Sequence, residues 1–326
     1  MEEAILNLNE EEIEQMIFLS NRFTENENPS KYPESFCQKS RECSLKIPKR
    51  ILDHFSQIYE NGFILFRNFP IEYLGETPEK NTEHLGEKTQ LAKIQGILLH
   101  VLGEMIAFEA EGDGHLFQDV VPVKKMESLQ TSIGSNIELE IHTEQAFSEL
   151  RPDFLSLACI RGDPTAFTYI LPVSRIIDNI VENDKDSENS ILWQPLWKTG
   201  VDLSFKLLGQ EFLEGDIRGP LAILNGTPEK PQLIFDQDLM TGITDEAQSK
   251  IEEIINIYYE CRIAHCLQPG EILIIDNRKV VHGRSAFSPK YDGNDRFIIR
   301  AFGYTIKKYS KSRYARKDRM ILAKYS

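Results

Sequence analysis

The chain of 326 residues carries 51 acidic and 37 basic side chains, which gives a formal net charge of −14. Such a charge disfavours nucleic acid as a partner, because two polyanions repel one another. With 41% hydrophobic and 27% charged residues, the composition is that of a globular protein and excludes a fibrous or disordered chain. The basic stretch 307–313 is a local exception that lacks a recognisable nucleic-acid module, so we expect it to be a solvated segment.

The cysteines and the N-terminus indicate a cytoplasmic protein. The five cysteines are odd in number and show no C-x-x-C spacing, which favours free thiols in a reducing compartment. The acidic N-terminus lacks the basic and apolar regions of a secretory signal. The longest apolar stretch, Ile97 to Leu102, is too short to cross a bilayer and is followed by Gly103 and Glu104. We therefore expect no membrane segment.

The first third of the chain predicts two helices around one strand. Acidic residues followed by apolar residues at helical spacing predict a helix from Glu10 to Phe23. Gly62 to Phe69 is a short apolar and aromatic run closed by Pro70, which is typical of a strand. The apolar content of Leu91 to Phe108 predicts a buried helix.

From about Leu116 the pattern is rich in strands. Strands are expected at Phe117 to Val123, Ile137 to Ile141, Phe154 to Ile160, Phe167 to Leu171, Arg262 to Leu267, Glu271 to Ile275 and Phe297 to Tyr304. Helices are expected at Ile176 to Val181 and Thr244 to Tyr259. No linker, repeat or low-complexity segment divides the chain. We therefore predict one domain over residues 1–326, mainly β with flanking helices, built on a double-stranded β-helix (a cupin-like jelly roll).

His142 and Glu144 form an H-x-E triplet at the end of one predicted strand. Side chains at i and i+2 of a strand share a face, so both reach one metal ion from one side. With His282 they make the two-histidine, one-carboxylate set of non-haem Fe(II) oxygenases. The triplet alone occurs often by chance, and the alternative is a surface histidine beside a solvated glutamate.

His282 lies just after a predicted strand and a polar turn, and Arg296 follows fourteen residues later. With these residues the chain, from Gly62 onward, resembles the Fe(II)/2-oxoglutarate-dependent oxygenases. It is most similar to the clavaminate synthase-like branch, which contains free L-amino acid hydroxylases acting on arginine, asparagine and lysine. The resemblance implies Fe(II) held by His142, Glu144 and His282, 2-oxoglutarate as cosubstrate, and dioxygen.

The resemblance also implies how the cosubstrate is held. Arg296 matches the arginine that grips the far carboxylate of 2-oxoglutarate, because a planar guanidinium pairs bidentately with a carboxylate. Thr168 matches the threonine that bonds the same carboxylate. A surface ion pair is the alternative for Arg296, and a purely structural role is the alternative for a strand threonine.

Several further residues match substrate positions of the family. Arg300 shares a strand face with Arg296 and would bind the substrate α-carboxylate, with an ion pair to a neighbouring acid as the alternative. Glu111 would hold the α-ammonium group, although a solvated acidic loop is equally consistent with Glu109 and Asp113 beside it. Ser132 would line the substrate pocket.

Asp236 and Asp238 form an Asp-x-Asp that bears on the identity of the substrate. Two carboxylates in a partly closed site favour a cation between them, so the pair would hold a cationic side chain. The alternative is a polar turn before Met240. The stretch Glu182 to Ser190 or the loop around Gly215 would supply a lid.

These features predict an Fe(II)/2-oxoglutarate-dependent hydroxylase of a free basic L-amino acid, most of all L-lysine at carbon 3 or 4, with succinate and CO2 as coproducts. L-Arginine or L-asparagine are the alternatives within the class. A catalytically inactive jelly-roll binding protein and a zinc hydrolase are alternatives outside it. A zinc hydrolase leaves Arg296 and Arg300 without a purpose.

Overall fold

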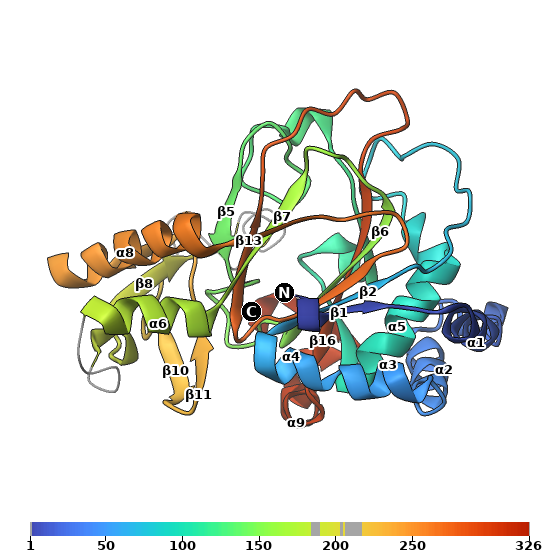
Figure 1. The fold of residues 1–326 in the computed structure, drawn as a ribbon, viewed down its shortest axis with the longest axis horizontal. Coiled ribbons are helices and arrows are strands. Elements are labelled where there is room, and N and C mark those ends of the chain that lie inside the picture. The colour runs from blue at the N-terminus through green and yellow to red at the C-terminus, as the bar shows by residue number, and fades with distance from the viewer. Residues whose placement is uncertain (1, 184–189, 203–204, 206–216, 326) are drawn as a thin grey trace.

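The computed structural model describes residues 2–183, 190–202, 205 and 217–325 (Figure 1). Most of the two segments predicted as lids, the stretch from Glu182 to Ser190 and the loop around Gly215, lies outside the described residues. Within the described part of the chain, no helix combines the length and the apolar character that crossing a membrane requires.

Two β-sheets form the centre of the fold (Figure 1). The larger sheet runs in the order β1 (Ile5–Asn7), β2 (Phe63–Arg67), β14 (Ile272–Asp276), β6 (Phe154–Arg161), β16 (Phe297–Tyr304), β3 (Glu104–Phe108), β18 (Met320–Ile321) and β17 (Arg316–Lys317), and β4 (Phe117–Val120) also pairs with β16. The smaller sheet runs in the order β13 (Ile263–Cys266), β7 (Phe167–Pro172), β15 (Val280–Arg284) and β5 (Leu139–His142). The predicted jelly-roll core is confirmed.

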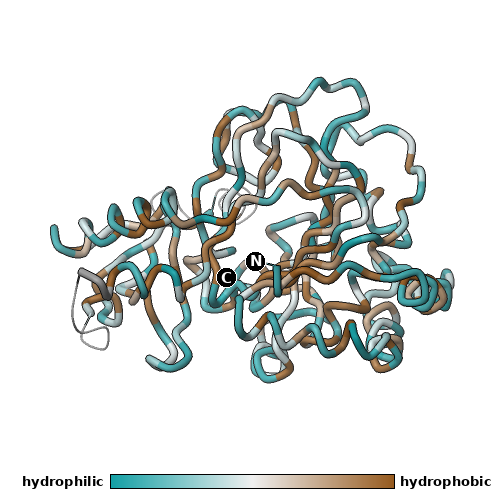
Figure 2. Tube along the Cα trace, in the orientation of Figure 1, coloured by the Kyte–Doolittle hydropathy of each residue, from teal (hydrophilic) through white to brown (hydrophobic). Residues whose placement is uncertain are grey.

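Helices from the N-terminal third cover one face of the larger sheet. They are α1 (Glu10–Ser20), α2 (Pro33–Ser44), α3 (Lys49–His54), α4 (Ser56–Asn61) and α5 (Gln90–Leu102). Helix α5 packs on β6 and β16. The central strand β14 is therefore buried on both faces, which explains its unbroken apolar run and its brown colour in Figure 2. The other face of the larger sheet is turned toward the smaller one.

The chain between β7 and β13 forms a separate layer beside the core, on the left of Figure 1. It contains α6 (Val173–Asn183), α8 (Asp245–Cys261), a sheet of β12 (Met240–Gly242), β8 (Trp197–Gly200) and β9 (Ile217–Leu221), and a hairpin of β10 (Leu224–Thr227) and β11 (Lys230–Leu233). An apolar cluster that includes Trp197 and Tyr258 holds this layer together. The sequence patterns missed all five of its strands.

Short elements complete the chain. They are the helix α9 (Ile306–Lys311) and the 3-10 turns η1 (Glu2–Ala4), η2 (Glu25–Glu27), η3 (Gly86–Lys88), η4 (Gly112–Gly114), η5 (Lys124–Met126), η7 (Ile191–Trp193), η8 (Ser312–Ala315) and η9 (Ala323–Tyr325).

Two of the predicted elements need correction. The expected helix from Leu91 to Phe108 is wrong in its second half, because α5 ends at Leu102 and the chain becomes strand β3 after Gly103. A side chain at Gly103 would overlap the carbonyl oxygen of Tyr304, so the glycine lets the chain turn closely past β16. His282 does follow a strand, β14, and a turn, but it lies within a further strand, β15, which the sequence analysis missed.

Candidate active site

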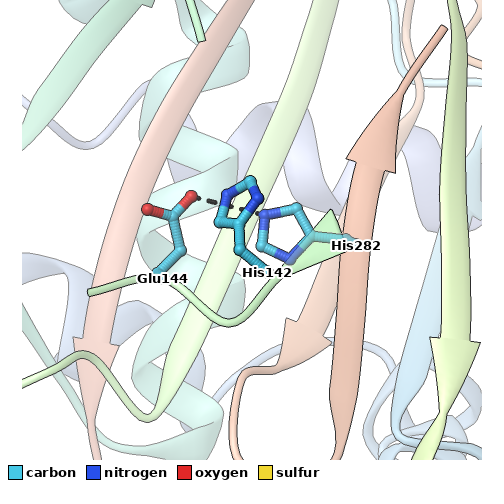
Figure 3. A group of neighbouring side chains, drawn as sticks. All are labelled: His142, Glu144 and His282. Atoms are coloured by element: carbon cyan, nitrogen blue, oxygen red, sulfur yellow. Dashed lines mark ion pairs between the residues drawn. The ribbon is translucent and has the colours of Figure 1, made fainter. Parts of the chain in front are cut away.

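His142, Glu144 and His282 converge between the two sheets (Figure 3). His142 is the last residue of β5, and His282 lies directly opposite it on the neighbouring strand β15. One ligand atom from each of the three side chains lies within 4.8 Å of the others. Glu144 and His282 are both buried, with Glu144 Oε1 3.4 Å from His282 Nε2. The strand pairing thus brings together residues that lie far apart in the sequence.

Glu144 lies just beyond the end of β5, so the expectation that the whole triplet sits on one strand holds only for its first residue. Its backbone is fixed by the buried Asn277, whose side chain accepts a bond from Glu144 N (2.8 Å) and donates to Glu144 O (3.2 Å). Thr143 N donates to Phe235 O at 2.8 Å, which extends the strand geometry past His142. These bonds keep the i and i+2 side chains on one side of the chain.

The protonation states of the three residues suit a metal ion. His142 Nδ1 lies 2.8 Å from the carbonyl oxygen of Glu140, an acceptor, which assigns the proton to Nδ1 and leaves Nε2 free to ligate. Burial, together with His142, lowers the pKa of His282 and so favours its neutral form. Burial opposes ionisation of Glu144, but Arg300 and the two histidines outweigh it and lower its pKa to about 2. Two imidazoles and one carboxylate on one side of a site are the ligand set of non-haem Fe(II) centres. This set leaves the other coordination positions of the metal for further ligands.

A cavity of about 740 Å³ surrounds this centre. Every candidate site residue from the sequence analysis lines it: His142, Glu144, His282, Arg296, Thr168, Arg300, Glu111, Ser132, Asp236 and Asp238. The structure therefore brings together the whole predicted set, although the residues come from positions 111 to 300 of the chain.

One end of the cavity is cationic. Arg296 and Thr168 are both buried there, Thr168 on β7 and Arg296 directly before β16. Arg284, on β15, is a second buried arginine that lines the same cavity. Burial and the neighbouring Arg296 lower the pKa of Arg284 to about 9. No ion pair with a carboxylate occurs for either arginine among the described residues.

Arg300 on β16 joins the metal centre to Glu111. Its Nη2 lies 3.0 Å from Glu111 Oε2, its Nη1 lies 3.5 Å from Glu144 Oε1, and its Nε donates to Gln118 at 2.8 Å. Glu111 follows β3, and burial raises its pKa to about 7 in spite of Arg300. The ion pair named as the alternative for Arg300 is thus present in the structure.

Carboxylates gather on another side of the cavity. Asp236 is buried, forms a bridge with His142, and accepts a bond from Leu239 N at 2.8 Å, so it also shapes the turn that was the alternative for this motif. Asp238 is exposed at the same turn, and Glu140 is half-buried beside it. Burial raises the pKa of Glu140, and so do Asp238 and Asp236. No lysine or arginine pairs with these three acids in the part of the chain that the structure describes.

Comparison with known proteins identifies the family. Residues 212–302 match the model "Taurine catabolism dioxygenase TauD, TfdA family". The chain is 42% identical over 298 residues to an L-lysine 3-hydroxylase of Catenulispora acidiphila, an alignment that covers 89% of this chain and 82% of that protein. The chain belongs to the Fe(II)/2-oxoglutarate-dependent amino acid hydroxylases.

Two further relatives support this assignment. An L-asparagine oxygenase of Streptomyces coelicolor is 35% identical over 247 residues, covering 75% of this hydroxylase and 72% of the relative. A solved asparagine oxygenase in complex with Fe(II), 2S,3S-3-hydroxyasparagine and succinate has a TM-score of 0.84 and 29% identity, covering 98% of this chain and 99% of that one. The reaction of this family requires Fe(II), 2-oxoglutarate and dioxygen, so those expectations are confirmed at the level of the family.

The sequence analysis missed several residues that shape the site of this hydroxylase. Asp202 lines the cavity, and burial, with Asp236 and Glu111 nearby, raises its pKa well above the usual range. No periodic pattern marks Asp202. Asn277 and Arg284 lie close to His282 in the sequence, but their contacts depend on segments that are distant in the sequence.

Proposed function

We propose that this protein hydroxylates free L-lysine at carbon 3, with 2-oxoglutarate converted to succinate and CO2. The observation that carries the choice of a basic substrate is the group of cavity carboxylates Glu140, Asp236 and Asp238, which no lysine or arginine of the described residues neutralises. The choice of carbon 3 rests on the relative that is 42% identical, an L-lysine 3-hydroxylase, since the L-lysine 4-hydroxylase of Flavobacterium johnsoniae is 28% identical over 259 residues.

His142, Glu144 and His282 would hold the Fe(II). When bound, Fe(II) with 2-oxoglutarate and dioxygen supplies the oxidant that breaks an unactivated C–H bond. The ionised Glu144 contributes the one negative charge of the ligand set, and Asn277 holds its backbone in place. His142 keeps its orientation through the contact with Glu140 O.

Arg296 and Thr168 would bind the far carboxylate of 2-oxoglutarate. A buried guanidinium without an ion pair in the described residues is a strong site for such an anion, because the carboxylate satisfies charge and hydrogen bonds together. Thr168 offers a hydroxyl donor from β7, a strand of the smaller sheet.

Arg300 and Glu111 would bind the backbone end of the amino acid. The two side chains form an ion pair with each other at 3.0 Å. An amino acid carries a carboxylate and an ammonium group of its own, so each partner exchanges one opposite charge for another without being left unpaired. Ser132 would contact the substrate from the facing loop.

Asp236 and Asp238 would bind the side-chain ammonium group of lysine. Fixing both ends of the substrate determines which carbon faces the metal and limits attack elsewhere. L-Arginine, with its longer side chain and its guanidinium group, is the second candidate for the same carboxylates. L-Asparagine, suggested by the relative that is 35% identical, brings no cation to them.

A panel of free amino acids tests the proposal. The purified protein is incubated with Fe(II), 2-oxoglutarate and each of L-lysine, L-ornithine, L-arginine and L-asparagine, and products heavier by one oxygen atom are measured by mass spectrometry together with succinate. We expect L-lysine to give the highest kcat/KM. A higher kcat/KM for L-asparagine would contradict the basic-substrate proposal, and the absence of succinate with every amino acid would favour the inactive binding protein.

We also propose a cytoplasmic location, because the five cysteines are free thiols in the structure. Fractionation of cells that produce the protein tests it, and recovery from the culture medium would contradict it.

A further inference from the structure

Arg284 lies where the cosubstrate carboxylate is proposed to bind, yet it has no role in the site described above. It follows His282 by two residues on β15, so its side chain shares the inward face of that strand. In the antiparallel pair of β15 and β7, Arg284 is directly opposite Thr168. Opposite residues in such a pair place their side chains on the same face. Both residues line the cavity.

The contacts of Arg284 hold its charge without neutralising it. Nη1 donates to Gly134 O at 2.8 Å and Nη2 donates to Ile137 O at 3.3 Å. The guanidinium also lies 4.9 Å from the centre of the Phe287 ring. These partners are carbonyl groups and an aromatic ring, and no ion pair with a carboxylate occurs among the described residues.

Arg284 is therefore a fixed cation beside a second cation, Arg296. Only 4% of the Arg284 side chain and backbone is exposed and only 6% of Arg296, so water screens neither charge effectively. Two like charges in a buried site are unfavourable until an anion enters. A ligand that brings a carboxylate to this end relieves the repulsion between the two arginines and therefore binds more tightly.

We propose that Arg284 is a positioning residue of the 2-oxoglutarate site, whose fixed charge adds to that of Arg296 in binding the far carboxylate. The inference rests on the proposed roles of Arg296 and Thr168. Arg296 is assigned the direct bidentate contact, because it makes no ion pair among the described residues, whereas each terminal nitrogen of Arg284 already donates one hydrogen bond to a backbone carbonyl. Arg284 acts through the electrostatic field of its fixed charge.

The proposal predicts selectivity among 2-oxo acids. 2-Oxopentanoate has the same five-carbon chain as 2-oxoglutarate and the same metal-binding end, but it lacks the far carboxylate. The positive charge of Arg284 attracts the far carboxylate of 2-oxoglutarate and so strengthens its binding. 2-Oxopentanoate has no charge at that end, so its binding should not depend on the charge of Arg284. A purely structural role would affect both ligands alike.

The test measures the Kd of each 2-oxo acid by calorimetry with Fe(II)-loaded, oxygen-free protein. We expect R284Q to weaken binding of 2-oxoglutarate about tenfold or more, since a charge in a buried site contributes at least that much to the binding of an anion. The Kd of 2-oxopentanoate should stay within about twofold of the wild-type value. R284K keeps the charge, so it should lose less than about threefold for 2-oxoglutarate. The exposed Arg313, changed in R313Q, is the matched control and should bind as wild type.

Equal weakening of both ligands in R284Q, or no weakening of either, would overturn the proposal. If R284Q does not fold, R284K decides, because a tenfold loss there for both acids shows that the charge is not what matters. R296Q tests the proposed cosubstrate site itself. It should also weaken binding of 2-oxoglutarate more than binding of 2-oxopentanoate, and equal effects on both ligands would contradict that site.

Discussion

Arg300 and Glu111 form an ion pair at 3.0 Å in the lining of the cavity, and Arg300 also lies 3.5 Å from Glu144 of the candidate metal site. The ion pair keeps both charges satisfied before an amino acid binds. It also places the predicted carboxylate-binding and ammonium-binding groups side by side, as the α-carbon of an amino acid requires. With the roles proposed for Arg300 and Glu111, the backbone end of the substrate would bind next to the metal.

The first prediction concerns this pair. R300Q should lower kcat/KM for L-lysine by about 100-fold or more, because it removes the partner of the substrate carboxylate and leaves Glu111 buried without its cation. The Kd for 2-oxoglutarate should change little. Steady-state kinetics and calorimetry measure the two effects, and a larger loss of 2-oxoglutarate affinity than of lysine turnover would contradict the assignment.

The carboxylates at Asp236 and Asp238 should determine preference for a charged side chain. D236N/D238N should lower kcat/KM for L-lysine by about 100-fold and raise the ratio of norleucine to lysine turnover, because norleucine has no ammonium group at that end. Competition assays with both amino acids measure the ratio. The exposed Asp178, changed in D178N, serves as the control. Unaltered lysine turnover in the double variant would exclude these residues as the cation site.

Asn277 should affect the metal centre without being a ligand. N277A removes both bonds to the backbone of Glu144, so we expect Fe(II) affinity to fall by about 10–100-fold. Anaerobic Fe(II) titration measures it, with the exposed N294A as the matched variant. Wild-type Fe(II) affinity in a folded N277A protein would show that Glu144 needs no such support.

The ion pairs that the buried Glu104 makes with Arg319 and Arg41 give a pH-dependent contribution to stability. Burial alone would raise the pKa of Glu104, but Arg319 and Arg41 outweigh it and hold the pKa below its ordinary value of 4.5. A carboxyl whose pKa is lowered on folding stabilises the protein above its ordinary pKa, and this contribution is lost as pH falls through the folded value.

E104Q should therefore lower the free energy of unfolding by about 2–4 kcal/mol at pH 7, and the difference from wild type should shrink as the pH falls below 4.5. Urea denaturation at several pH values measures it, with the exposed E79Q as the control. A difference that stays constant down to pH 3 would contradict the ionic origin of the effect.

The candidate metal site was predictable because the H-x-E triplet marks His142 and Glu144, and the resemblance to the family adds His282, Arg296 and Arg300. All five residues line one cavity. The strands of the core were predictable because β6, β14 and β16 are almost wholly buried and their residues are mainly apolar.

Other parts depend on contacts that no local pattern records. The end of α5 is set by the close approach of Gly103 to Tyr304, two residues that are distant in sequence. The layer between β7 and β13 consists of short strands that pair within the layer, so their periodicity is too brief to recognise. Asp202 and Arg284 gain their importance only from the charges around them, which come from other strands and loops.

The position of the new hydroxyl group is the most direct test of the proposed function. L-Lysine is incubated with Fe(II), 2-oxoglutarate and the protein, and the product is analysed by two-dimensional NMR. We predict a single hydroxyl group on carbon 3, with one succinate formed per lysine consumed. Hydroxylation at carbon 4 would contradict the proposed choice of carbon 3, and formation of succinate without any oxidised lysine would contradict the way in which Arg300, Asp236 and Asp238 are proposed to place the substrate.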